Sequence, residues 1–327
     1  MTKTKKIYIV LILLVILLIS LYLAMYAGYK DFGYNMLFKA FNLSDDTEST
    51  ILTVLRYPRA LKAFVAGCCL ALAGMFMQSI SKNPLAEPYI TGISSGAGLG
   101  IVLSILFFNS ANYSVFGFIG ALLSSAIVIL FSGFSKFSIT KLILIGLSLN
   151  IFVSSLISLI ILVNPTKSYM MMLILSGGVT NNEIISNKVL LILFISILLL
   201  SAIFIPKLNY LRLDSDLLEA NKSKKNLFIV VFILLSAFLT SLSVFAAGIL
   251  GFIGIIAPQI SRMLLGQDYR WLFVSNVLIG STFILLADFI ARTVVYPLQV
   301  PLGLVVAFIG APIFVYFLTR KGDMFRD

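Results

Sequence analysis

Ten apolar runs of roughly membrane-spanning length dominate this chain and restrict it to membrane-spanning folds. Hydrophobic residues make up 60% of the sequence and charged residues 11%, whereas a soluble domain carries about 25% charged residues. A helix needs about 20 apolar residues to cross the hydrocarbon core of a bilayer. The sequence therefore predicts an all-α, polytopic membrane protein with one transmembrane domain over 1–327. The expected spans are 7–27, 60–80, 91–109, 113–133, 141–163, 188–206, 227–247, 249–265, 272–291 and 303–319.

Basic residues predict that both ends of the chain lie in the cytoplasm. The run at 7–27 follows three lysines and is too long for a signal-peptide core, so we expect it to be the first span. Sixteen Lys and Arg residues then fall inside and eight outside, as the positive-inside rule requires. The net charge of +11 arises in these short loops, so no nucleic-acid partner is expected. The weakest boundary lies at Ala246-Ala247-Gly248, between the seventh and eighth spans, since one long kinked helix there would move the C-terminus outside.

The residue inventory argues against catalysis in this polypeptide. The chain has no histidine and therefore lacks the commonest ligand for a bare transition metal and the usual proton shuttle. It also has no Walker A pattern for binding nucleotide phosphates. Cys68 and Cys69 are adjacent within an apolar run, which indicates small packing residues rather than a disulfide. We expect a conduit without cofactor, metal site or enzymatic activity.

The stretch from Arg56 to Gly100 carries charge, proline and glycine at the ends of two consecutive spans. Arg56 and Arg59 precede the second span, where both guanidinium groups are expected to be accessible to carboxylates of a docking protein or to lipid phosphates. Residues 83–88, called the elbow below, contain two prolines that forbid a continuous helix. The four glycines over 92–100 should let the third span approach a neighbour closely. The elbow is a candidate for a gate at the cytoplasmic face.

Later spans also carry polar residues near their ends. Pro258 is expected to kink the eighth span, where Gln259 and Arg262 add polar groups. Asp288 and Arg292 are spaced i, i+4 in the ninth span, which favours a local ion pair. The alternative is an unpaired carboxylate that carries protons in a secondary transporter.

The longest cytoplasmic connection, 207–226, places leucines among charged residues. This spacing is typical of an amphipathic helix lying against another protein or the membrane surface. A solvated hairpin loop is the alternative.

Together these stretches resemble the FecCD-type permease family, the membrane subunits of ABC importers for iron-siderophores, haem and cobalamin. The resemblance implies ten helices, a homodimer or close heterodimer, two ATPase subunits at the cytoplasmic face and an extracytoplasmic substrate-binding protein. It also implies the cytoplasmic (inner) membrane of a bacterium. The matching segments are Arg56-Tyr57-Pro58-Arg59, Gly74 with Gln78, Asn83–Pro88, Gly92–Gly98, Gly251–Pro258, Leu286–Arg292 and Gly310-Ala311-Pro312.

The resemblance implies roles for individual residues. Those expected to dock the binding protein are Arg56, Arg59 and Arg292. Those expected to line the cytoplasmic gate are Asn83, Leu85, Ser138 and Thr140. Those expected to contact the ATPase in the coupling loop 207–226 are Leu213, Asp214, Leu217, Leu218 and Glu219. The chain departs from the family pattern at Gln259 and Tyr269, which replace histidines, at Gln299, which replaces a glutamate, and at Asn221-Lys222, which replaces Leu-Gly.

The expected function is a permease subunit that passes a metal chelate, with ferric siderophore as the first expectation and haem or cobalamin as alternatives. Haem is less favoured because the chain has no histidine, although tyrosine or Met170–Met172 could ligate iron. A stand-alone, proton-coupled secondary transporter that uses Asp288 is the alternative of another class. A receptor or scaffold without transport fits poorly with two proline-interrupted spans.

Overall fold

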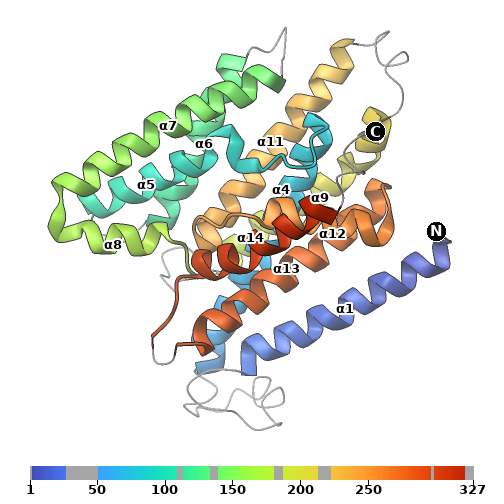
Figure 1. Cartoon of the computed structure of the whole chain (residues 1–327), viewed down its shortest axis with the longest axis horizontal. Helices are drawn as coiled ribbons and strands as arrows, with labels where there is room; N and C mark the ends of the chain where they lie inside the picture. Colours follow the sequence, from blue (N-terminus) through green and yellow to red (C-terminus); the bar gives the residue numbers. More distant parts are fainter. Residues whose placement is uncertain are drawn as a thin grey trace.

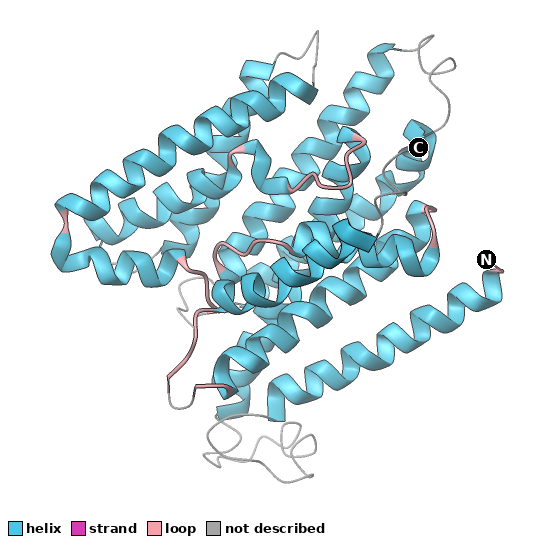
Figure 2. Ribbon diagram, in the orientation of Figure 1, coloured by secondary structure: helices cyan, strands magenta, loops and turns pink. Residues whose placement is uncertain are grey.

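The computed structural model describes residues 2–26, 51–108, 113–132, 139–179, 187–212, 222–295 and 298–320, and helices are the only regular elements among them (Figure 2). Each of the ten expected ranges overlaps a helix. These helices are α1 (Lys3–Tyr26), α4 (Tyr57–Ser81), α5 (Ile93–Phe108), α6 (Tyr113–Ser132), α7 (Ile139–Val163), α9 (Asn187–Arg212), α11 (Lys222–Ala247), α12 (Ile253–Leu265), α13 (Tyr269–Thr293) and α14 (Leu302–Arg320). Three shorter elements, η1 (Ile51–Arg56), η2 (Pro88–Thr91) and α8 (Pro165–Leu175), complete the described set.

Seven of the described helices are long and apolar enough to cross a membrane by themselves, and α5, α12 and α14 are shorter. Helix α12 has 13 residues, which at about 1.5 Å per residue is too short for a hydrocarbon core of about 30 Å. The backbone that continues the chain beyond such a short helix therefore depends on neighbouring protein for hydrogen bonds.

Helix α4 lies at the centre of the bundle and packs against α11, α12 and α13 (Figure 1). Its small residues permit very close contact, because a Cβ atom built on Gly67 would lie 2.1 Å from the carbonyl oxygen of Gly280. A Cβ on Gly74 would lie 1.9 Å from the carbonyl oxygen of Gly254. Glycine is thus required where α4 crosses α13 and α12. Helix α1 packs along α13 at the edge of the bundle.

Helices α5, α6, α7 and α8 form a second group, on the left in Figure 1. Here α5 and α6 meet at glycines: a Cβ on Gly96 would lie 2.5 Å from the carbonyl oxygen of Gly120, and one on Gly100 would lie 2.1 Å from that of Phe116. The expected close approach of the third span to a neighbour is confirmed. Helix α8 was not predicted from the sequence, although Pro165 stands at its first turn, a position that proline favours.

Two expected boundaries can be compared with the structure. Helix α11 ends at Ala247 and Gly248 has φ +74°, so the seventh and eighth runs form two helices rather than one. The expected limits of the 207–226 loop are wrong, because α9 continues to Arg212 and α11 already begins at Lys222. The polar end of α9 is stabilised by a contact of Asn209. The Nδ2 of Asn209 donates a hydrogen bond to Oδ1 of Asp268 at 3.2 Å.

The glycine contacts of α4 generate a stability prediction. Gly74→Ala should destabilise the folded permease by about 1–3 kcal/mol, the usual effect of overpacking, because the new methyl group meets backbone that cannot rotate away. The midpoint of thermal unfolding in detergent measures the effect. Gly178→Ala is the matched control, since a Cβ there meets nothing within 4 Å. Equal midpoints for the two variants would contradict the proposed contact.

Candidate functional site: the outer charge cluster and the elbow

The end of α13 that is expected to lie outside holds a buried carboxylate between two arginines. The side chain of Asp288 is fully buried; its Oδ1 lies 2.9 Å from Nε of Arg59, and its Oδ2 lies 3.0 Å from Nε of Arg292. The expected local pair of Asp288 with Arg292 is confirmed. The alternative of an unpaired carboxylate is wrong, because Arg59 of α4 supplies a second cation that sequence spacing did not reveal.

Two arginines of this region also cap the C-terminal end of α1. Arg56 donates from Nη1 to the carbonyl oxygen of Met25 at 2.6 Å, and Arg292 donates from Nη2 to that of Ala24 at 2.9 Å. The last carbonyls of a helix have no partner within the helix and favour a nearby cation. Arg56, Arg59, Asp288 and Arg292 are called the outer charge cluster below.

Exposure differs from the expectation for Arg56. This residue is only 7% exposed, so the expectation that both guanidinium groups of the second span are freely accessible is wrong there. The side chain of Arg59 is 17% exposed, and its Nη1 donates to Oε1 of Gln299 at 2.9 Å. Gln299 thus contacts Arg59 as a neutral acceptor.

A further cap lies on α5. Lys167, in α8, donates from Nζ to the carbonyl oxygens of Ile105 and Leu106 at 3.1 and 3.0 Å. These carbonyls belong to the last turn of α5. Lys167 is one of the eight basic residues expected on the outer side, and its role as a helix cap depends on a contact between segments that are distant in sequence.

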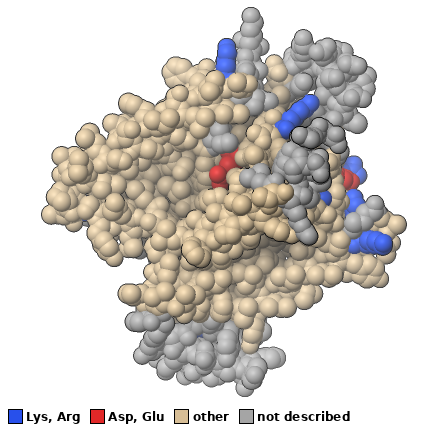
Figure 3. Space-filling view, in the orientation of Figure 1, with Lys and Arg blue, Asp and Glu red and all other residues tan. Residues whose placement is uncertain are grey.

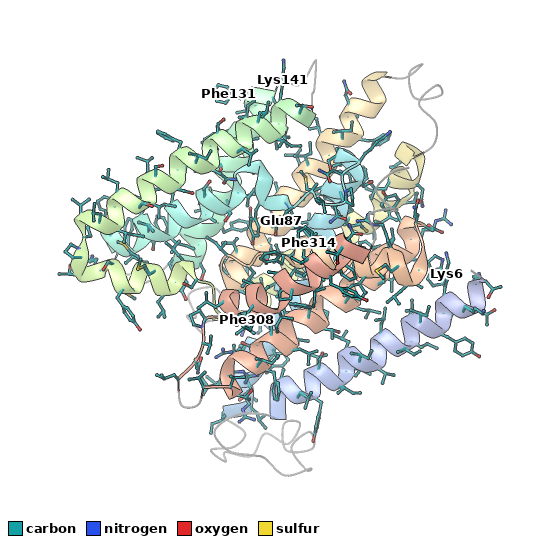
Figure 4. The ribbon with its side chains drawn as sticks, in the orientation of Figure 1. Lys6, Glu87, Phe131, Lys141, Phe308 and Phe314 are labelled. Carbon is teal, nitrogen blue, oxygen red and sulfur yellow. The ribbon has the colours of Figure 1, made fainter. Side chains whose placement is uncertain are left out.

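The elbow contains residues with two kinds of surroundings. Asn83 is exposed, and its Oδ1 accepts a hydrogen bond from the backbone N–H of Leu85 at 2.9 Å, which closes a tight turn. Leu85 is 36% exposed. Glu87 instead points back into the bundle, where its Oε1 accepts from the backbone N–H of Phe252 at 2.9 Å (Figure 4). Asn83 and Leu85, the two candidate gate residues on the elbow, therefore lie on a turn that Glu87 attaches to Phe252.

Helices α4, α12 and α7 all bond to the chain around the elbow. Gln78 donates to the carbonyl oxygen of Gly254 at 2.9 Å, which ties α4 to α12. Gln259 of α12 donates to the carbonyl oxygen of Pro84 at 3.0 Å. Asn150 of α7 donates to the carbonyl oxygen of Tyr89 at 3.1 Å. The bond from Gln259 holds the elbow itself, and the other two hold Gly254 and Tyr89 beside it.

Glu87 also lies near the centre of the face drawn in Figures 3 and 4. Figure 3 shows acidic atoms at the centre of the face, between the α5–α8 group and α14, and Figure 4 labels Glu87 at this place. Burial raises the pKa of this carboxyl group, and the hydrogen bond from Phe252 partly opposes the change. The prolines of the elbow are evident in the sequence, but no sequence pattern there indicates a role for Glu87.

Several predicted residues lie outside the described residues, namely Ser138, Leu213, Asp214, Leu217, Leu218 and Glu219. Thr140 is exposed in the first turn of α7, next to Lys141 (Figure 4). Within the described ranges, no group of three Cys, Asp or Glu side chains is placed to hold a metal ion.

Comparison with known proteins decides the class of this molecule. The profile of the FecCD transport family matches residues 13–320. The chain belongs to the FecCD transport family. As a permease of this family it is the membrane subunit of an ABC importer and does not itself catalyse ATP hydrolysis. It is a multi-pass membrane protein, and its class implies ATPase and binding-protein partners.

Individual relatives agree with this assignment. This FecCD permease is 32% identical over 292 residues to the Bacillus subtilis "Probable siderophore transport system permease protein YfhA", covering 86% of this chain and 84% of the relative. It is 32% identical over 280 residues to the hemin transport system permease protein HmuU of Yersinia pestis, covering 82% and 83%. A solved metal-chelate type ABC transporter in an inward-facing conformation superposes with a TM-score of 0.81 at 28% identity, covering 96% of this chain and 99% of the other.

The outer charge cluster generates a second stability prediction. Asp288→Ala should destabilise the permease by about 3–5 kcal/mol, because it leaves two partly buried guanidinium groups without their shared carboxylate. Arg59→Met combined with Asp288→Ala should cost less than the sum of the single changes. Thermal unfolding in detergent measures each variant. Arg270→Met, which removes an exposed cation at the start of α13, is the control and should be near neutral; additive single effects would argue against a shared cluster.

Proposed function

We propose that this FecCD permease conducts a ferric siderophore across the cytoplasmic membrane of a bacterium while partner subunits hydrolyse ATP. The observation that carries the proposal is the match of the family profile over residues 13–320, together with an all-helical architecture like that of a metal-chelate type transporter. The contacts of Asp288 support it too, because its ion pairs with Arg59 and Arg292 give this carboxylate a structural role in joining α4 and α13.

The chelate is the finer part of the proposal. Relatives at similar identity are named for different iron compounds: YfhA for a siderophore, HmuU for hemin, and the B. subtilis protein YfmD, 31% identical over 280 residues, for Fe(3+)-citrate. Ferric siderophore is proposed because YfhA and a second B. subtilis permease, 33% identical over 301 residues, carry that name. Haem, ferric citrate and cobalamin are the competing cargoes.

The proposed assembly contains two permease copies, two ATPase subunits and one extracytoplasmic binding protein. All ten apolar segments are proposed to cross the membrane, the eighth as α12 together with the non-helical residues that precede it. Both termini are proposed to lie in the cytoplasm. The connection between α9 and α11 is proposed to contact the ATPase through Leu213, Asp214, Leu217, Leu218 and Glu219. Its position supports this, because α9 ends at Arg212 and the first turn of α11 contains three lysines, as is typical of a cytoplasmic connection.

Two further sites complete the proposal. Arg56, Arg59 and Arg292 are proposed to present positive charge to carboxylates of the binding protein. The cytoplasmic gate is proposed to contain Asn83, Leu85, Ser138 and Thr140. Exposure of Asn83, Leu85 and Thr140 supports this second assignment, since a gate residue must be able to meet its counterpart across the path.

Reconstitution tests the proposed energy source. The permease in vesicles with its ATPase subunits and loaded binding protein should accumulate iron-55 hydroxamate siderophore when ATP is supplied. The permease alone should not accumulate it under a proton gradient. Labelled haem, ferric citrate and cobalamin are assayed in parallel, and preferential uptake of one of them would replace the siderophore. Concentrative uptake by the permease alone would refute the proposed function.

Arg59 offers the clearest test of docking, because its side chain is the most exposed of the two arginines on Asp288. Arg59→Gln should weaken binding of the substrate-binding protein by about tenfold, within the range for losing one charged contact. The thermal midpoint of each variant, measured beside its affinity, separates docking from folding. Arg270→Gln, on the opposite end of α13, should leave the affinity unchanged. Unchanged affinity in a folded Arg59→Gln permease would remove the docking role.

A further inference from the structure

The segment that joins α11 to α12 leaves the helical path and carries backbone donors into the protein interior. Residues 248–252 are not helical, and Leu250 is 1% exposed. A buried N–H group without a partner costs about 1–3 kcal/mol, so each donor in this segment needs an acceptor. Gly248 donates to the carbonyl oxygen of Val244 at 2.8 Å, as the last step of α11. The backbone N–H groups of Leu250 and Phe252 do not bond to α11 and have acceptors in another segment.

The acceptors for these two N–H groups come from the elbow and from Tyr89, the residue that follows it. The backbone N–H of Leu250 donates to Oη of Tyr89 at 3.1 Å, and that of Phe252 donates to Oε1 of Glu87 at 2.9 Å. Phe252 is the residue before α12 and has φ +66°, an unusual conformation for a residue with a side chain. A carboxylate at this place also faces the N-terminal end of α12, where negative charge is favourable.

We infer that Glu87 and Tyr89 form a clasp that makes the elbow follow α12, so that the position of α12 sets the position of the candidate gate residues. The clasp is defined as the two hydrogen bonds from Leu250 and Phe252 to these side chains. The inference rests on the proposed function, because it takes Leu85 as part of the gate. Glu87 and Tyr89 are positioning residues in this scheme.

Packing leaves little freedom for the elbow to slide along α12. A Cβ atom on Gly254 would lie 2.8 Å from Cδ of Pro88, so the end of the elbow touches the first turn of α12 directly. Gln259 holds the carbonyl oxygen of Pro84 one turn further along the same helix. The elbow thus contacts α12 at its N-terminus, its first turn and its middle. Movement of one without the other would break all three contacts.

The clasp requires an acceptor atom rather than a charge at position 87. Glutamine offers the same carbonyl-type oxygen at the same distance from the backbone as a glutamate oxygen. Glu87→Gln should therefore preserve the clasp, whereas Glu87→Ala should remove it. A site for a proton or a cationic cargo would instead lose its function in both variants, because neither glutamine nor alanine carries the charge.

The experiment measures how accessible position 85, a candidate gate residue, is in the complete transporter. Leu85→Cys is introduced into the permease, assembled with its ATPase subunits in vesicles, and the rate of maleimide modification is measured without nucleotide and with a non-hydrolysable ATP analogue. Cys68 and Cys69 are fully buried, so the added thiol is the intended target. Nucleotide should change the rate by about fivefold, the lower range of allosteric coupling between sites.

The variants then separate the clasp from the gate. Glu87→Ala and Tyr89→Phe should each reduce the nucleotide effect towards a ratio of one, while Glu87→Gln should retain it. Tyr169→Phe, at a tyrosine that is 77% exposed, is the matched control for the lost hydroxyl and should retain it as well. If Glu87→Ala does not assemble, Tyr89→Phe still decides, because it keeps the buried ring and loses one oxygen.

Three results would overturn the inference. A nucleotide effect that survives unchanged in both Glu87→Ala and Tyr89→Phe removes the clasp and leaves the proposed function intact. A loss in Glu87→Gln equal to that in Glu87→Ala assigns Glu87 a role as a charge instead. No nucleotide effect in the parent Leu85→Cys protein removes the gate assignment of the proposed function, and the clasp falls with it.

Discussion

Buried helix ends are the constraint on which this fold depends. A helix leaves its first N–H and last C=O groups without internal partners, and inside a membrane protein water is not there to bond them. The chain meets this need with charged side chains from distant segments. Arg56 and Arg292 bond the end of α1, Lys167 bonds the end of α5, and Glu87 bonds the start of α12. Charge at these helix ends is thus used for structure before it is available for anything else.

The same constraint explains how broken segments can exist inside the bundle. Both the elbow and the segment 248–252 depart from helical geometry, and each supplies what the other lacks, since one offers side-chain acceptors and the other backbone donors. Because Gly254 has no side chain, α12 can approach both Pro88 of the elbow and the backbone of α4 closely. The bundle therefore contains irregular backbone whose polar groups are paired within the protein.

Hydropathy predicted where the helices lie, because a spanning run must be apolar whatever it packs against. It could not predict where they end: α9 continues over Lys207 and Asn209, since those polar side chains find partners in Phe228 and Asp268. The pair of Asp288 with Arg292 was predictable because i, i+4 spacing makes it local. Arg59 stands 229 residues from Asp288 in sequence, so no spacing rule could reveal it. The glycines of α5 were predicted to permit close packing, but the partner, α6, came from the fold.

The structural duties of the outer arginines do not exclude a docking role. Arg56, Arg59 and Arg292 contribute three positive charges to the cluster and Asp288 one negative charge, so these four side chains retain a net charge of +2. Gln299 accepts a hydrogen bond from Arg59 and adds no charge, whereas a glutamate there would offset one of the positive charges. Charges fixed by such contacts lose little side-chain entropy when an acidic partner arrives, and partly buried charges are less screened by salt than exposed ones. A cluster that first holds α1 in place can thus also give its end of the molecule a stable positive field towards which a carboxylate-bearing protein is steered.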